Sequence, residues 1–162
     1  MKKWAGQRVL RVAMEQSALD AGCSWEDFLR TENVIVPSQT NPGARKYLEL
    51  PFSCHLISYG NNVVASVSGR CQEFVTDYLS RFAPEHCFET PNLHVLNDAL
   101  EREGLRVCFM AEYFLPDFNA LNALECSLPY EADGAEGFRS TVLPGVEATP
   151  CVRSVRIWTC WA

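Results

Sequence analysis

The strongest constraint on the fold is a pair of apolar, strand-forming runs separated by a turn-forming tetrapeptide. The runs are Cys54–Ser58 and Val63–Val67, and Tyr59-Gly60-Asn61-Asn62 lies between them. Gly and Asn tolerate positive φ, so the tetrapeptide can reverse the chain between two extended segments. The sequence therefore predicts a β-hairpin, and the apolar side chains of the hairpin require further elements to cover them.

Two segments that precede the hairpin have helical spacing. Apolar residues recur every three or four positions between Trp4 and Asp20, and Gly22 can end this helix in the left-handed conformation. Ser24 and Asp27 have the spacing of a capping box, in which two side chains satisfy the first turn of a helix. We therefore expect an amphipathic helix followed by a short second helix.

Two helices are also expected after the hairpin. Apolar residues over positions 74–82 share one helical face, and Pro84 prevents the helix from continuing. In the next segment Thr90 is the expected N-cap, Pro91 occupies the first helical position, and Gly104 ends the helix.

Two more strands complete the predicted order of elements. Val34-Ile35-Val36 is β-branched and stops at Pro37, and the apolar stretch Leu105–Leu115 stops at Pro116. The order is then ααβββααβ, which is typical of helices layered on a sheet. The predicted fold class is α/β (α+β), with a mixed sheet that contains a β-hairpin and carries helices packed on it.

The 162 residues fit one domain, but regular spacing does not continue to the end of the chain. The periodic pattern stops near Pro129, and the residues from Glu131 onward contain no Lys. We predict an N-terminal α/β domain over residues 1–128 and an irregular C-terminal tail over residues 129–162. Deletion of Glu131–Ala162 is expected to leave the fold standing.

The acidic charge balance argues against partners that carry phosphates. The net charge is -6 and the pI is near 5.1, whereas nucleic acids and anionic membranes are bound through clustered Lys and Arg. No run approaches the roughly 18 apolar residues of a membrane-spanning helix, and no signal peptide is recognisable. We expect a cytoplasmic protein without nucleic-acid or membrane partners, whose eight cysteines are reduced thiols.

His86-Cys87 and His94 are the first candidates for chemistry, because imidazole and thiolate bind zinc and a Cys beside a His can ionise. Structural zinc sites present paired ligands two to four residues apart, and no C-x-x-C occurs here, so no metal is expected. A nucleophile at Cys87 or Cys54 is a weaker alternative to a buried structural thiol. The role of the segment His86–Pro91 stays open.

Acidic side chains accompany the last two predicted helices, and one desolvated carboxylate among them would serve as a general base. These residues are Glu85, Glu89, Asp98, Glu101 and Glu103. A solvated helix face is the favoured interpretation, and Asp98 has i,i+4 spacing to Arg102 for an ion pair. Catalytic and cofactor-binding residues are therefore left unassigned.

Five segments, in order along the chain, carry a resemblance to a known family. They are Ala13–Ser17, Glu32–Pro37, Ser58–Ser66, His86–Asn92 and Val107–Tyr113. Together they resemble the N-terminal region of a group of bacterial GNAT-family N-acetyltransferases over residues 4–124. The resemblance implies a partial GNAT-like layered fold. In such proteins the region precedes a catalytic domain that binds acetyl-coenzyme A and transfers its acetyl group to an amine.

The resemblance implies no activity for this chain by itself. The pyrophosphate loop of the family reads R/Q-x-x-G-x-G/A between a strand and a helix. Gln39–Ala44 places its glycine one residue late and has Pro42 where an N–H donor is required. The chain also stops before a catalytic domain could fit, so no catalytic residue is transferred and no cofactor is expected in this chain. Acetyl-coenzyme A belongs to the complete family protein.

Two functions from different classes follow. The first is the non-catalytic N-terminal portion of a GNAT-type acetyltransferase, whose partner is the missing catalytic domain. The alternative is a stand-alone binding or dimerisation module that self-associates through the surface which that domain would cover. A Cys-dependent enzyme is a weaker third candidate.

Residues 140–147 can be back-translated so that a shifted reading frame encodes Ala-Leu-Tyr-Cys-Pro-Glu-Trp, which is similar to the family's continuation. We therefore hypothesise that the chain is a frameshifted or truncated product.

Overall fold

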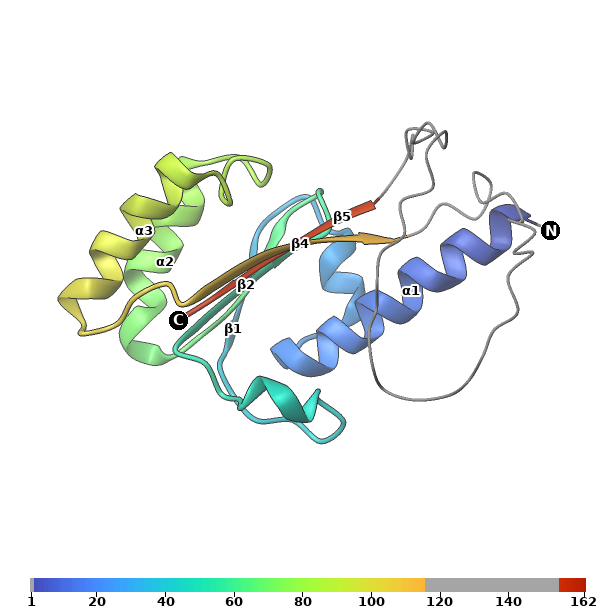
Figure 1. Cartoon of the computed structure of the whole chain (residues 1–162), viewed down its shortest axis with the longest axis horizontal. Helices are drawn as coiled ribbons and strands as arrows, with labels where there is room; N and C mark the ends of the chain where they lie inside the picture. Colours follow the sequence, from blue (N-terminus) through green and yellow to red (C-terminus); the bar gives the residue numbers. More distant parts are fainter. Residues whose placement is uncertain (1, 116–154) are drawn as a thin grey trace, which may run out of the picture.

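Five strands form one mixed sheet with helices on both of its faces (Figure 1). The computed structural model describes the backbone of residues 2–115 and 155–162, and the side chains of residues 8–115 and Ala162. The strand order is β1-β3-β2-β5-β4. This arrangement confirms the α+β fold class predicted from the order of helical and strand-forming segments.

The amino-terminal helices lie where their spacing predicts them. Helix α1 covers Lys2–Ala21, and Gly22 follows it with a left-handed φ of 75°. The short second helix is the 3-10 helix η1, Trp25–Leu29. The backbone N–H of Ser24 donates to the Asp27 carboxylate at 2.9 Å, which is one half of the predicted capping box.

The predicted hairpin is confirmed as β2 (Cys54–Ser58) and β3 (Val63–Val67), which pair antiparallel. The Ser58 hydroxyl holds the turn together, because it donates to the Asn62 carbonyl at 2.6 Å and accepts from the Gly60 N–H at 3.0 Å. Gly60 has a φ of 100°, where a Cβ is disfavoured.

Strand β1 (Val34–Pro37) pairs in parallel with β3, which makes the sheet mixed. The 3-10 helix η2 (Lys46–Leu48) lies between β1 and β2. Asn33 fixes the start of β1, since its side chain donates to the Leu79 carbonyl at 3.0 Å and accepts from the Val63 N–H at 2.8 Å. One amide thus joins three parts of the fold.

The helices after the hairpin also form. The elements are η3 (Gly69–Cys71), α2 (Gln72–Arg81) and α3 (Thr90–Arg102). One detail of the prediction is wrong, because Glu89 is the N-cap and Thr90 is already the first helical residue. Pro91 still lies in the first turn, where its missing N–H costs no helical hydrogen bond. Gly104 follows the helix with a φ of 72°, as predicted.

Strand β4 (Phe109–Leu115) is shorter than the predicted strand Leu105–Leu115. The Asn97 side chain of α3 accepts a hydrogen bond from the Val107 N–H at 2.9 Å. Leu105 and Val107 pack against the core beside α2 and α3. The first four residues of the predicted strand therefore serve as a connection along α3.

Strand β5 (Val155–Trp161) corrects the expectation of an irregular tail over residues 129–162. It pairs antiparallel with β2 on one side and with β4 on the other. Sheet hydrogen bonds are made by backbone groups, so a segment without a regular apolar period can still become a strand. The predicted boundary near Pro129 and residues 129–154 lie outside the described residues.

Two hydrophobic cores lie on opposite faces of the sheet. Leu56 of β2 belongs to the core under α2 and α3, and the next residue, Ile57, belongs to the core under α1 and η1. Figure 1 shows α2 and α3 on one side of the strands and α1 on the other. The hairpin is therefore the middle layer and is covered on both faces.

Candidate functional site

The structure separates the residues of the predicted His–Cys cluster. Cys87 is buried, its thiol donates to the Phe82 carbonyl at 3.6 Å, and burial raises the pKa of the thiol to about 11. His86 is exposed, and its Nδ1 lies 2.9 Å from the Glu89 carboxylate, which raises the pKa of the imidazole. His94 is exposed on α3. Cys87 is therefore a structural core thiol and not an activated nucleophile.

Cys54, the other candidate nucleophile, and two further cysteines are also shielded from solvent. Cys54 is buried in the core under α2 and α3, and Cys71 lies in the same core. Burial raises the pKa of Cys23 to about 12. Within residues 2–115 and 155–162, no group of three or more His, Cys, Asp or Glu residues is placed to hold a metal ion. The side chains of the three cysteines beyond residue 115 lie outside the description.

The acidic residues around α3 form a solvated face, as favoured from the sequence. Glu85, Glu89, Asp98, Glu101 and Glu103 are all exposed. The predicted ion pair is wrong, because among the described salt bridges none joins Asp98 to Arg102. The side chain of Asn97 donates instead to Glu101 at 2.7 Å. A desolvated carboxylate base is therefore not found in this group.

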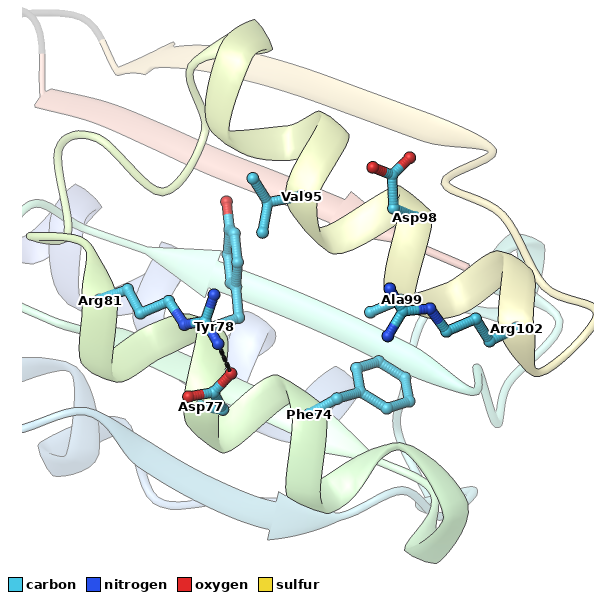
Figure 2. Close-up of a pocket in the computed structure, with 8 residues that line it drawn as sticks. All are labelled: Phe74, Asp77, Tyr78, Arg81, Val95, Asp98, Ala99 and Arg102. Carbon is cyan, nitrogen blue, oxygen red and sulfur yellow. Dashed lines mark hydrogen bonds and ion pairs between the residues drawn. The ribbon is translucent and has the colours of Figure 1, made fainter.

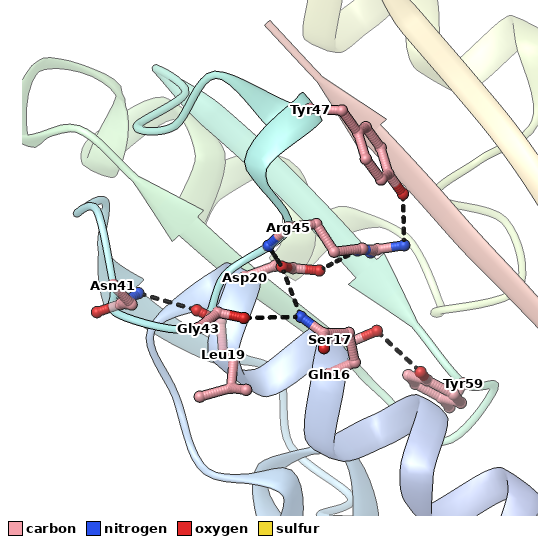
Figure 3. A network of polar contacts seen from close by, with 9 residues as sticks. All are labelled: Gln16, Ser17, Leu19, Asp20, Asn41, Gly43, Arg45, Tyr47 and Tyr59. Atoms are coloured by element: carbon pink, nitrogen blue, oxygen red, sulfur yellow. Dashed lines mark hydrogen bonds and ion pairs between the residues drawn. The ribbon is translucent and has the colours of Figure 1, made fainter.

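The loop Gln39–Ala44 seals the end of α1 and does not open a helix onto a ligand. The Asn41 amide donates to the Leu19 carbonyl at 3.1 Å, and the Gln16 amide donates to the Gly43 carbonyl at 3.3 Å (Figure 3). Gly43 has a φ of 87°, which allows the chain to turn over the helix end. The loop leads into η2, whose three residues are too few for an anion-binding helix terminus.

A groove of about 280 Å³ lies between α2 and α3. Figure 2 shows Phe74 and Tyr78 on α2 facing Val95 and Ala99 on α3. Four charged side chains lie along the groove. Asp77 and Arg81 form an ion pair on α2, and Asp98 and Arg102 come from α3. This pattern is typical of the outer seam between two packed amphipathic helices.

An ion pair between the buried Asp20 and the half-buried Arg45 clamps the loop after β1 to the end of α1 (Figure 3). Asp20 has a fully buried carboxylate, which accepts from the Arg45 backbone N–H at 2.8 Å and lies 2.5 Å from the Arg45 Nε. Gln16 donates to the same carboxylate at 3.2 Å, and Arg45 also donates to the Tyr47 hydroxyl at 2.9 Å. A buried charge with this many hydrogen bonds is satisfied, so the cluster is a structural clamp.

His55 is a second buried titratable group close to this clamp. It is 2% exposed on β2, and burial lowers its pKa to about 4, with a further lowering by Arg45 and an opposing effect of Asp20. The Phe52 ring packs edge-on against the imidazole, with ring centroids 5.5 Å apart. His55 is therefore neutral in the folded protein at pH 7, which suits a core residue.

A pocket of about 430 Å³ lies between α1 and the face of the sheet. Its lining residues are Val9, Val12, Ala13, Gln16, Ser17, Arg45, Ile57, Tyr59, Tyr113 and Leu115. The walls are mainly apolar, and the polar groups come from α1, from the hairpin turn and from Arg45 of the clamp. The sequence carried no motif for this pocket, because its residues come from four separate segments.

Strand β4 exposes large apolar side chains on both of its faces. Phe109, Met110, Tyr113 and Phe114 have exposed fractions of 39%, 41%, 43% and 58%. β4 stands at the end of the strand order and pairs with β5, and no other described strand pairs with it. Several exposed large apolar side chains grouped on one strand are typical of a binding surface.

Two global findings bear on identity. No helix of the described residues is both long and apolar enough to cross a membrane. Comparisons with protein families, with curated proteins and with solved structures found no match for this chain.

Proposed function

We propose that this chain is a non-catalytic binding region, the N-terminal portion of a GNAT-type acetyltransferase, and that a catalytic domain docks on strand β4. The observation that carries the proposal is the exposure of large apolar side chains on both faces of β4. The segment Val107–Tyr113, which carries part of the resemblance to the family, covers most of this strand. The complete protein acts in the cytoplasm under this proposal.

The physical case for docking is that an edge strand with exposed aromatic residues is costly to leave uncovered. Its outer backbone groups and its apolar faces together form a template for pairing with another chain. Covering Met110, Tyr113 and Phe114 would remove apolar surface from water at roughly 25 cal/mol per Å². A folded partner with an apolar face or a sheet edge meets both requirements.

The described side chains support a non-catalytic role. The thiol of Cys87 has a raised pKa because it is buried, and the imidazole of His55 is kept neutral by burial. The Asp20 carboxylate is already paired with Arg45. Under the proposal, acetyl-coenzyme A is bound by the partner domain, which also performs the acetyl transfer.

The second candidate is a stand-alone dimerisation module, which the open edge of β4 favours. Two copies of the seven-residue strand could pair antiparallel across this edge, so that one sheet continues into the next. Such an interface is isologous, because Phe114 of one copy would lie near the start of the partner's strand. The two candidates use the same surface but differ in what covers it.

Two measurements test the acetyltransferase proposal. The nucleotide sequence that encodes the chain and the region after it, read in all three frames, should contain an R/Q-x-x-G-x-G/A loop between a strand and a helix. Calorimetric titration of this chain with acetyl-coenzyme A should show no binding tighter than about 100 μM, roughly -5.5 kcal/mol. Tight binding, or the absence of any such loop in all frames, would contradict the proposal.

Sedimentation velocity separates the two candidates. The mass of the chain is measured over a range from about 1 μM to about 1 mM, where weak association is visible. A dimer that is lost in Phe114→Glu but kept in Leu29→Glu, a change at another exposed apolar site, on η1, supports the dimerisation module. A monomer at all concentrations supports docking of a catalytic domain. Association that Phe114→Glu leaves intact excludes β4 as the surface.

A further inference from the structure

The pocket between α1 and the sheet shares Tyr113 with the proposed docking surface, but most of its lining comes from α1, the hairpin and Arg45. Its volume of about 430 Å³ is within the range of sites that hold small molecules. Val12 and Ala13 of α1 form one wall, and Ile57 of β2 forms the floor. Tyr113 and Leu115 of β4 contribute to the lining on the other side. These apolar side chains would remove part of the surface of a small apolar molecule from water.

A pair of buried hydroxyls is the main polar feature of this pocket. The Ser17 Oγ and the Tyr59 hydroxyl lie 2.9 Å apart, and the two residues are only 7% and 8% exposed (Figure 3). Two hydroxyls carry two hydrogen atoms, and their mutual hydrogen bond uses one of them. Among the described residues no acceptor is placed for the second hydrogen. Because Ser17 and Tyr59 line the pocket, an oxygen atom of a ligand bound there could accept this hydrogen.

The charges around the pocket favour an uncharged ligand. Arg45 reaches the pocket, but its guanidinium is paired with the buried carboxylate of Asp20 at 2.5 Å. The Gln16 amide is already bonded to Asp20 and to the Gly43 carbonyl. Burial raises the pKa of Tyr59, so its hydroxyl remains a neutral donor at pH 7. An ion in this pocket would lose its hydration, and it would find no unpaired opposite charge there to compensate for that loss.

We propose that this pocket binds a small, uncharged, mostly apolar molecule that presents one oxygen acceptor, such as an aryl ketone or an amide, to the Ser17–Tyr59 hydroxyl pair. The ligand's apolar part lies against Ala13, Ile57 and Leu115. Either hydroxyl can point its hydrogen at the ligand while the other donates within the pair. The pair therefore acts as one donor with two interchangeable members.

Fluorescence titration of the full chain with 6-propionyl-2-(dimethylamino)naphthalene tests the site. This probe is an uncharged naphthyl ketone whose emission moves to shorter wavelength in apolar surroundings. We expect a saturable, blue-shifted signal with one probe per chain. Each single variant, Ser17→Ala or Tyr59→Phe, retains one hydroxyl donor and should weaken binding by less than about 3-fold, whereas the double variant should weaken it about 10-fold, the effect of one lost hydrogen bond.

Matched control variants distinguish binding in the pocket from binding elsewhere on the chain. Ala13→Leu fills the pocket without adding charge and should abolish the signal. Tyr47→Phe removes a tyrosine hydroxyl that bonds Arg45 outside the pocket and should leave binding unchanged. Phe114→Glu alters the proposed docking surface and should also leave it unchanged, so failure of this site and failure of the proposed function are read separately. Circular dichroism verifies that each variant is folded.

Four results would overturn the proposal. Three of them are the absence of saturable binding to the unaltered chain, full binding by Ala13→Leu, and equal binding by the double hydroxyl variant and the unaltered chain. The last result would show that Ser17 and Tyr59 only fasten α1 to the hairpin turn. A signal that Phe114→Glu removes would place the probe on β4 and would also exclude the pocket.

Discussion

The β2–β3 hairpin and strand β4 are both rich in apolar residues, but only the hairpin is covered. Every residue of β2 and β3 is buried, whereas every residue of β4 is exposed or half-buried. The hairpin lies between β1 and β5 in the sheet and between two hydrophobic cores. Among the described strands, β4 stands at the end of the sheet. An apolar composition therefore indicates that a segment is to be buried. The position of the segment in the sheet decides whether elements of the same chain or a partner bury it.

This difference has a functional meaning. The side chains of the hairpin contribute to folding, because α1, α2 and α3 already pack around them. The apolar side chains of β4 contribute less to the stability of this chain and retain more of their surface for binding. The predictions below test this contrast, beginning with the change that should affect both regions.

Removal of β5 should have the largest effect, because this strand joins the two regions. A chain that ends at Tyr130 lacks β5, which pairs with His55–Ser58 and with all of β4. At about 1 kcal/mol per backbone hydrogen bond, the loss should be roughly 5 kcal/mol or more of unfolding free energy. The urea midpoint of the truncated chain measures it. An unchanged midpoint would restore the expectation, made from the sequence alone, that the segment Glu131–Ala162 is dispensable.

A matched pair of alanine substitutions compares the two regions directly. Leu56 of β2 and Met110 of β4 both pair with Cys160 of β5, so they lie in one row across the same face of the sheet. Leu56 is fully buried and Met110 is 41% exposed. Leu56→Ala should cost about 3 kcal/mol or more and Met110→Ala less than about 1 kcal/mol, as measured by urea unfolding. Equal losses would show that β4 is as much a part of the core as the hairpin.

Acid should destabilise the covered region through His55. Its folded pKa of about 4 lies below the ordinary value of 6.5, so the unfolded chain binds the proton more tightly. Above pH 6.5, His55 should therefore add no pH dependence to the free energy of unfolding. As the pH drops from 6.5 to 4, protonation of His55 should lower the free energy of unfolding by up to about 3 kcal/mol. His55→Gln should flatten this part of the profile.

The control for this titration is a histidine outside the covered region. His86 is exposed and paired with Glu89, which raises its pKa, so its contribution has the opposite sign. His86→Gln should leave the destabilisation between pH 6.5 and 4 in place. Chemical unfolding at a series of pH values gives both profiles. A profile for His55→Gln that parallels the unaltered chain would show that burial of the imidazole is not the cause.

The smallest effect on stability is expected at Phe114, the most exposed of the apolar residues in β4. Phe114→Ser removes a ring that is 58% exposed and should change the unfolding free energy by less than about 1 kcal/mol. The same change should raise the solubility of the chain, because it reduces the exposed apolar surface. Thermal unfolding and a solubility limit in ammonium sulfate measure the two quantities. A loss of several kcal/mol would show that β4 is covered within this chain.

The elements that could be predicted are those whose signals are local. Gly60 and Ser58 close the hairpin within a few residues, and Gly22 and Gly104 end helices through their own backbone conformation. The glycine position and the proline of the loop Gln39–Ala44 argued against a phosphate cradle from the sequence alone. Such features depend on steric rules that act within one turn of the chain.

The features that could not be predicted depend on residues far apart in sequence. Asp20 and Arg45 form the buried clamp, yet in sequence Asp20 is one of many acidic residues and Arg45 belongs to a basic pair. Ser17 and Tyr59 are 42 positions apart and form a hydroxyl pair only because α1 packs on the hairpin. His86-Cys87 and His94 formed the more suggestive sequence pattern, but the structure does not bring these three side chains together into one site.

The sequence by itself determined the α+β class, the hairpin, the glycine-terminated ends of α1 and α3 and the absence of a phosphate-binding motif. These follow from periodicity, positive-φ positions and turn chemistry, which are properties of neighbouring residues. Only the tertiary structure decided that β5 enters the sheet between β2 and β4, that β4 is left at the edge, and that a pocket opens between α1 and the sheet. The reason is that strand order and burial are set by long-range packing, in which a backbone hydrogen bond or an apolar contact can be made with any segment that arrives at the correct distance.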